Sequence, residues 1–281
     1  MYLQGIQKVY ACLNVAKVLI NWDLSLLSGR EIDVSNVIEV KNVCKNYTDF
    51  SLNNLSFSLP MGCIMGLVGQ NGAGKTTMIR LILNMANRDG GEIRIFGLDN
   101  LNDEQKIKQD IGAVFDEIFF VDIWRVREVE KVIRGFYSKW DSKLYRQYLT
   151  KFRLPVDKKI KDLSRGMKMK LMLAVALSHE AKLLILDEPT SGLDPVARDE
   201  LLEILKAYIA DGQKSILFST HITSDLEKIA DYITLIDNGN LIYTGTKDDL
   251  LKRFSGLLPS SALLTIDEIL VFISKGGRLH E

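Results

Sequence analysis

The alternation of apolar and polar residues changes along the chain, and this change predicts the order of strands and helices. VIEVKNVCKNY (37–47) and LSFSLP (55–60) alternate as half-buried strands do. CIMGLVG (63–69) is instead continuously apolar and ends in glycine, as expected of a strand buried on both faces. TTMIRLILNMA (76–86) follows with helical spacing. These residues therefore predict a strand, a loop and a helix, the start of an α/β unit.

The rest of the chain continues this pattern around a helical interruption. Strands are predicted at GEIRIFG (91–97), IGAVF (111–115), KLLILDEP (182–189) and SILFSTH (215–221). From about Asp116 to His179 the signals are helical, in VREVEKVIRGFYSKW (126–140), in KLYRQYLTKF (143–152) and in the stretch after LSRG. PVARDELLEILKAYIADG (195–212) predicts an amphipathic helix ended by glycine, and ADYITLIDNGNLIYTG (230–245) a hairpin with an Asn-Gly turn. After about Thr246 we expect one helix, a loop with Pro259 and a short apolar segment.

Composition narrows the range of partners. The 281 residues contain 36 Lys plus Arg and 36 Asp plus Glu, so no net field favours nucleic acid or an anionic membrane. Cys12, Cys44 and Cys63 show no metal-ligand spacing and are interpreted as packing residues in a reducing compartment. No apolar run approaches the roughly 20 residues that span a bilayer, so a membrane function would need another chain to cross.

The first residues do not join the pattern. VYACLNVAKVLI (9–20) resembles the apolar part of a signal peptide, but no clean cleavage site follows. We interpret residues 1–36 as an N-terminal extension. A hypothesis for it is that translation normally starts at Val34 from a GTG codon, because Gly29, Arg30 and Glu31 could be encoded by a purine-rich ribosome-binding sequence.

GQNGAGKTT (69–77) fits the phosphate-binding pattern GxxxxGK[ST] and lies between the predicted strand and helix that this motif requires. Its glycines let backbone N–H groups curl around phosphates, and Lys75 supplies a point charge to the β and γ phosphates. Thr76 offers a hydroxyl to Mg²⁺. The predicted nucleotide-binding residues of this loop are Gly69, Gln70, Asn71, Gly72, Ala73, Gly74, Lys75, Thr76 and Thr77.

Two acids and a histidine follow later buried strands. Asp187 ends LLILD and is predicted to hold Mg²⁺ through its water shell, while Glu188 is predicted to orient or deprotonate an attacking water. His221 ends SILFSTH at the same edge of the sheet, where a γ-phosphate contact is expected. Lys75, Glu188 and His221 are therefore the predicted catalytic residues. His179 has no such partner in the sequence and is interpreted as structural.

With these residues placed, the chain strongly resembles the nucleotide-binding subunit of ATP-binding cassette (ABC) transporters over about 37–246. LSRGM at Leu163 resembles that family's LSGGQ signature, SGLD at 191–194 its D-loop, and Tyr47 its adenine-stacking aromatic. The resemblance implies an α/β P-loop NTPase core with a mostly parallel sheet, an antiparallel β subdomain and an inserted helical subdomain at about 116–180. Residues 247–281 would be a C-terminal helix and tail.

The resemblance also implies a partner for LSRGM. In this family two ATP sites form between two domains arranged head to tail, so Ser164 and Gly166 would contact ATP held by another subunit. A serine N-cap alone is the plainer interpretation of the same residues. Arg165 and Met167 stand where the family usually has glycine and glutamine. Asp116 stands where the family has a glutamine that joins the ATP site to the helical subdomain; it could bind Mg²⁺ or water, and slowed or differently coupled turnover is expected.

The function implied is an ATPase, with ATP and Mg²⁺ as cofactors, that dimerises with itself or a homologue and drives a separate membrane permease of bacterial exporter type. It would lie in the cytoplasm, on the inner face of the membrane, with no nucleic-acid partner. The permease contact is expected near 116–140, where FFVDIWRV (119–126) is apolar and aromatic, although half-buried core explains that pattern equally well.

Two alternatives stay open. A soluble ABC ATPase of DNA maintenance or translation is disfavoured, because about 87 positions between Thr76 and Leu163 leave no room for a long coiled coil. A single cassette also argues against the tandem translation factors. A nucleotide-gated regulatory subunit with weak turnover is disfavoured by Glu188 and mildly favoured by Asp116.

Overall fold

The computed structural model describes residues 36–117, 119–255, 264–275 and 277. The interpretation of the N-terminal extension, the Val34 start-site hypothesis and the packing role of Cys12 therefore lie outside the described residues, Asn36 excepted. In the parts of the chain that the structure describes, no helix has both the length and the hydropathy needed to cross a membrane.

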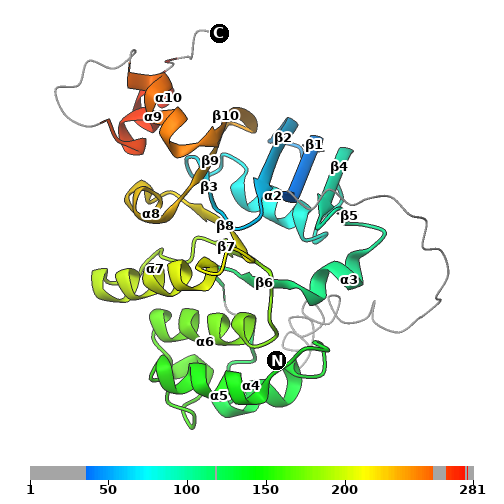
Figure 1. Ribbon diagram of the computed structural model, residues 1–281, viewed down its shortest axis with the longest axis vertical. Helices are drawn as coiled ribbons and strands as arrows, with labels where there is room; N and C mark the ends of the chain where they lie inside the picture. Colours follow the sequence, from blue (N-terminus) through cyan, green and yellow to red (C-terminus); the bar gives the residue numbers. More distant parts are fainter. Residues whose placement is uncertain (1–35, 118, 256–263, 276, 278–281) are drawn as a thin grey trace.

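The described strands form one sheet, in which an antiparallel part adjoins a parallel part (Figure 1). The strands are β1 (Asn36–Asn46), β2 (Ser51–Pro60), β3 (Ile64–Val68), β4 (Gly90–Ile95), β5 (Leu98–Asp99), β6 (Ile111–Val114), β7 (Leu183–Asp187), β8 (Ser215–Thr220), β9 (Tyr232–Asp237) and β10 (Asn240–Thr246). Their order in space is β5-β4-β1-β2-β10-β9-β3-β8-β7-β6. Strands β9, β3, β8, β7 and β6 pair in parallel, whereas β2, β1, β4 and β5 pair antiparallel.

Helices cover both faces of the parallel strands. They are α2 (Lys75–Ile82), α3 (Glu104–Gln109), α4 (Val126–Ile133), α5 (Ser142–Lys151), the 3₁₀ helix η2 (Ile160–Asp162), α6 (Arg165–Leu177), α7 (Pro195–Ile209), α8 (Thr223–Ile229), α9 (Lys247–Ser255) and α10 (Ile266–Ser274). Leu183 and Ile185 of β7 join a core with α2 and the antiparallel strands. Leu184 and Leu186 join the other core, with α6, α7 and α8. Alternate side chains of one buried strand thus serve two cores, which explains its continuous apolar pattern.

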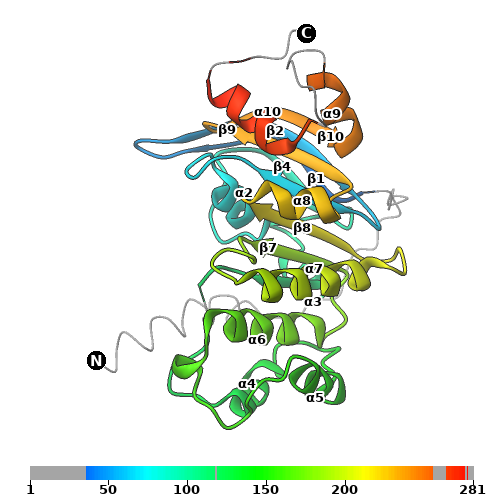
Figure 2. The same ribbon diagram turned by 90° about the vertical axis from the view of Figure 1, so that its left-hand side faces the viewer.

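The helical subdomain and the C-terminal helices lie at opposite ends of the molecule (Figures 1 and 2). Helices α4, α5 and α6 lie between β6 and β7 in the chain and pack beside the β6 edge, while α9 and α10 lie beyond β10. The predicted fold class, a P-loop α/β core with an antiparallel subdomain and inserted helices, is confirmed.

The predicted boundaries were wrong in two helical regions. The described residues of 116–125 are not helical. The helix predicted over 126–140 ends at Ile133, close to Gly135, whose backbone freedom disfavours a helix interior. A new helix starts after Asp141, whose Oδ1 accepts hydrogen bonds from the N–H groups of Lys143 and Leu144.

The second correction concerns the C-terminal region, where we expected one helix and a tail. The short apolar segment instead forms a second helix, α10. Thr265 and Glu268 make a reciprocal capping box at its start, and Ile266, Ile269 and Ile273 are buried at helical spacing.

Candidate nucleotide-binding site

The loop 69–77 connects β3 to α2 and follows the path that its glycines permit. Gly74 has φ 114°, in the left-handed region, and an added Cβ there would lie 2.5 Å from Cδ2 of Leu52. At Gly69 an added Cβ would lie 2.2 Å from the carbonyl oxygen of Ile236. A side chain at Gly74 would collide with β2, and a side chain at Gly69 would collide with β9. The two glycines therefore let the loop lie directly against these strands.

Lys75 begins α2 and points its ammonium group back into the loop. Its side chain is 6% exposed, and Nζ donates to the carbonyl oxygens of Gly69 at 2.8 Å and Gln70 at 3.2 Å. Nζ also lies 3.5 Å from Oε1 of Glu188. The positive charge is therefore held where the loop backbone and the helix N-terminus converge, as anion binding requires.

Thr76 and Asp187 meet at the end of β7. Oγ1 of Thr76 donates to Oδ2 of Asp187 at 2.9 Å, and Oγ of Ser219 donates to Oδ1 at 2.5 Å. Among the described residues, no cluster of three or more His, Cys, Asp or Glu side chains could hold a metal unaided. Mg²⁺ that arrives with nucleotide phosphates needs only one or two protein oxygen groups, so Thr76 and Asp187 fit this ion.

Glu188 lies between the two other predicted catalytic residues. Its Oε2 accepts a hydrogen bond from Nδ1 of His221 at 2.8 Å, while Oε1 faces Lys75. A carboxylate can only accept, so Nδ1 of His221 is the donor in this contact. The backbone N–H of Glu188 donates to the carbonyl oxygen of Ser219 at 3.0 Å. The sheet edge therefore brings Lys75, Glu188 and His221 together, as the sequence predicted.

LSRGM lies at the start of α6, and α6 and α2 lie on opposite sides of β7 (Figure 2). Ser164 is the N-cap, and its Oγ accepts the N–H of Met167 at 3.3 Å. Gly166 faces α7, where an added Cβ would make ordinary contacts of 3.6 Å with Leu193 and 3.9 Å with Ala197. The plainer N-cap interpretation is thus confirmed locally, and the predicted contact with ATP on another subunit stays a prediction.

Asp116 follows β6, whose Val114 pairs with Leu186, the residue before Asp187. Oδ1 of Asp116 accepts a hydrogen bond from Nη2 of Arg165, and the two form an ion pair. Its predicted Mg²⁺ role stays a prediction. Tyr47 is 48% exposed, and Nζ of Lys45 lies over its ring, 5.4 Å from the centroid. Its predicted contact with adenine stays a prediction.

His179 is fully buried away from this site. Nε2 lies 3.0 Å from the carbonyl oxygen of Ile111, and the ring stacks on Tyr137 with centroids 3.8 Å apart. Burial lowers the pKa of His179, although its hydrogen bonds to Ile111 and Val175 oppose that shift. These contacts confirm the structural interpretation.

Two supporting residues were not predicted from the sequence. Ser219 hydrogen-bonds Asp187, and its position near the end of β8, two residues before His221, was the available signal. Gly239, in the hairpin turn, donates its N–H to the carbonyl oxygen of Ala73 at 3.0 Å and accepts the N–H of Asn53 at 2.9 Å. The turn was predicted, but no local pattern indicates that it supports a loop so distant in the sequence.

Comparisons with known proteins agree with this geometry. The ABC transporter family model matches residues 52–191. The ABC transporter ATP-binding protein YtrB of Bacillus subtilis is 30% identical over 203 residues, covering 72% of this chain and 69% of that protein. Nod factor export ATP-binding protein I of Rhizobium meliloti is 36% identical over 241 residues, covering 78% and 67%. Bacitracin transport ATP-binding protein BcrA of Enterococcus faecalis is 31% identical, covering 77% and 71%.

A solved structure shares the fold. The structure described as an ATP-binding subunit of an ABC transporter superposes with a TM-score of 0.75 at 29% identity, covering 85% of this chain and 99% of that one. The phosphate loop, the paired acids after β7 and these relatives lead to one conclusion. The chain belongs to the ABC transporter family and resembles its ATP-binding subunits throughout the described core.

Proposed function

We propose that this chain hydrolyses ATP, dimerises head to tail around two ATP molecules and drives a separate membrane permease of exporter type. The observation that carries the proposal is the position of Glu188 between Lys75 and His221, with Asp187 and Thr76 in contact beside it. Family membership supports ATP hydrolysis in general. The dimer, the permease and the residue roles are our inference.

In this proposal Glu188 orients and deprotonates the attacking water, and His221 fixes the carboxylate through Nδ1. Lys75, held by the loop carbonyls, moves onto the β and γ phosphates when ATP binds. Mg²⁺ bound with ATP, near Thr76 and Asp187, would neutralise charge on the phosphates. Tyr47 offers an exposed ring on which adenine stacks.

Ser164 and Gly166 complete the ATP site of the other subunit. The hydroxyl of Ser164 already accepts from Met167, which leaves its proton for donation to an anion. The start of α6 adds its positive dipole end. Gly166 lets the backbone approach phosphate closely.

The permease contact is proposed on the segment from Asp116 to Trp140, within the helical subdomain of about 116–180. Phe119 is 39% exposed and Ile123 is 68% exposed, as a docking surface requires, while Phe120 and Trp124 pack against the core. Relatives named for Nod factor export and bacitracin transport support an exporter. Such a subunit would lie on the cytoplasmic face of the membrane, held there by the permease.

A second candidate is a nucleotide-gated regulatory subunit with weak turnover. Asp116 favours it, because a carboxylate here cannot donate a hydrogen bond and adds negative charge near a triphosphate. The arrangement of Glu188 and His221 favours the ATPase instead.

The test is ATP hydrolysis by the purified protein and by Glu188→Gln. We expect the substitution to lower kcat at least about 100-fold, because it removes the base, while ATP binding persists. Equal turnover in both proteins, or none in the unmodified protein at saturating ATP, would contradict the proposed function. If no permease co-purified with the protein from membranes, the soluble ATPase would be favoured instead.

A further inference from the structure

Arg165 connects three separate segments of the chain through one side chain. Its Nη2 donates to Oδ1 of Asp116, 49 positions away. An added Cβ on Gly192 would lie 2.9 Å from Nη1 and 3.2 Å from Cδ of Arg165. The guanidinium therefore packs on the backbone of Gly192 while it pairs with Asp116.

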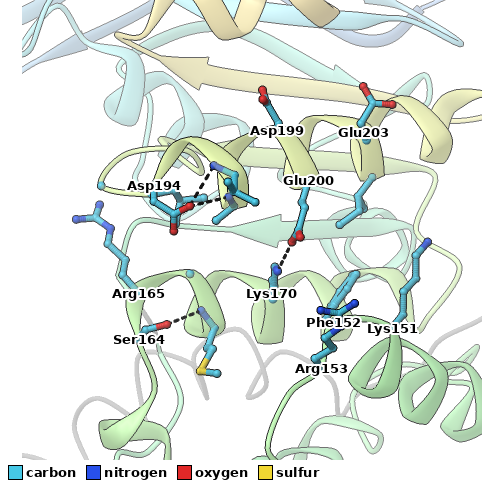
Figure 3. Close-up of a pocket in the computed structure, with 17 residues that line it drawn as sticks. Lys151, Phe152, Arg153, Ser164, Arg165, Lys170, Asp194, Asp199, Glu200 and Glu203 are labelled. Carbon is cyan, nitrogen blue, oxygen red and sulfur yellow. Dashed lines mark hydrogen bonds and ion pairs between the residues drawn. The ribbon is translucent and has the colours of Figure 1, made fainter.

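Each of these segments belongs to the proposed ATP machinery. Asp116 lies where the chain leaves β6, Arg165 lies between Ser164 and Gly166, and Gly192 lies between Glu188 and α7. Figure 3 shows Arg165 extending from the start of α6 toward the loop before α7, at one end of a groove of about 970 Å³. The side chain thus bridges the residues proposed for one ATP site and the loop that carries Glu188 at the other.

The loop that carries Glu188 has two unfavourable local features. Glu188 has φ 51°, which is unfavourable for a residue with a side chain. Oγ1 of Thr190 is buried without a hydrogen-bond partner among the described residues. Native proteins pair almost all buried polar groups, so both features are local costs in the loop that carries Glu188.

We infer that Arg165 is a positioning residue that couples the two ATP sites of the dimer. When Ser164 and Gly166 engage the nucleotide on the partner, Arg165 moves with them because it lies between them in the chain. Its planar, charged group carries that movement to Asp116 and Gly192, and so to the Glu188 loop of its own subunit. The inference rests on the proposed function, because it requires a head-to-tail dimer.

The ion pair is suited to coupling rather than to stability. The side chains of Arg165 and Asp116 are 45% and 49% exposed, and such pairs contribute little to folding. A neighbouring ion pair offers a matched control. Lys170 and Glu200 also join α6 to the α7 side of the groove, with Nζ and Oε2 2.5 Å apart, but neither contacts Asp116 or Gly192 among the described contacts.

The test is a double-mutant cycle with Arg165→Gln, Asp116→Asn and the double variant, made in the full chain. We expect each single variant to lower kcat about fivefold or more and the Hill coefficient for ATP to about 1. The melting temperature should not change in either single variant, and the ATP affinity of the monomer should not change in Arg165→Gln. If the two residues act through one contact, the double variant loses no more than the worse single variant. Lys170→Gln should keep both kcat and the Hill coefficient.

Three results would overturn the inference alone: single variants that behave like the unmodified protein, losses that multiply in the double variant, or an equal loss in Lys170→Gln. The last would mean that any loosening between α6 and α7 has the same effect. Absence of hydrolysis in the unmodified protein would overturn the proposed function, and this inference with it.

Discussion

Glu188 is held in place by its backbone as much as by its side-chain partners. Its φ of 51° turns the chain directly after Asp187, so that two successive carboxylates face different partners. Asp187 faces Thr76 and Ser219, whereas Glu188 faces Lys75 and His221. The division of roles that we propose between metal contact and base thus accompanies one unfavourable backbone conformation, which the surrounding contacts maintain.

Ser219→Ala tests the support of Asp187. Without the Ser219 hydroxyl, Oδ1 of Asp187 loses a hydrogen bond, and we expect the Mg²⁺ concentration for half-maximal hydrolysis to rise roughly 10-fold. Ser215→Ala is the control, because Ser215 is equally buried at the other end of β8 and contacts Gly62 instead. An unchanged Mg²⁺ requirement in Ser219→Ala would show that Asp187 needs no such support.

His179 should make stability depend on pH. Its pKa is lowered by burial below the ordinary 6.5, so the unfolded chain binds the proton more readily. The free energy of unfolding should therefore fall as pH drops below about 6.5, by at most about 1.4 kcal/mol per pH unit, and stay constant above it. In His179→Asn this slope should decrease in urea unfolding at about pH 5.5 and about pH 7.5. An identical slope in both proteins would exclude His179 as its source.

At the scale of elements, the β9–β10 hairpin holds the phosphate loop. Gly239 has φ 74°, and an added Cβ would lie 1.8 Å from the carbonyl oxygen of Ser51. We expect Gly239→Ala to lower the free energy of unfolding by about 2 to 4 kcal/mol and to weaken ATP binding, because the Ala73 contact is lost.

The control for this substitution is Gly212→Ala. Gly212 has a similar φ of 70° but no atom within 4 Å of an added Cβ, so only the backbone term of about 1 kcal/mol applies. Urea unfolding and nucleotide titration of both variants measure the difference. If Gly239→Ala were no more harmful than Gly212→Ala, close packing of the hairpin on the loop would not matter.

Elements with a strong periodic or turn signal could be predicted from the sequence. The buried strands β3, β7 and β8, the helix α7 and the Asn238-Gly239 turn were predicted because their residues alone specify burial, capping or positive φ. The end of α4 and the second C-terminal helix were missed, because short helices depend on caps and on the surface that they cover. Helix α10 packs against α8, and its first N–H donates to Glu227, a contact that no local pattern encodes.

Some residues of the candidate site could likewise be predicted from the sequence, and others could not. Lys75, Asp187, Glu188 and His221 could be placed together because each follows or precedes a buried strand of one parallel sheet. The pairing of Asp116 with Arg165 could not be predicted, because these residues are 49 positions apart and joined by three helices with irregular connections. In the sequence, Asp116 and Arg165 each looked like an isolated departure from a family motif.

At the scale of the whole molecule, the proposed ATP site is complete only with a second subunit. The residues around Lys75 and the start of α6 belong to different parts of one chain, and the proposal joins them only across a head-to-tail dimer. ATP should therefore be the agent that holds two subunits together, and hydrolysis should release them.

Trapping the ATP-bound dimer tests this claim most directly. Glu188→Gln should bind ATP without turnover and shift to dimer mass in size-exclusion chromatography with light scattering when ATP is present. Adding Ser164→Arg to Glu188→Gln should leave ATP bound to a monomer, because the bulky cation blocks the contact with the partner's nucleotide. Failure of Glu188→Gln to dimerise with ATP, or an equal dimer fraction with and without Ser164→Arg, would contradict the account.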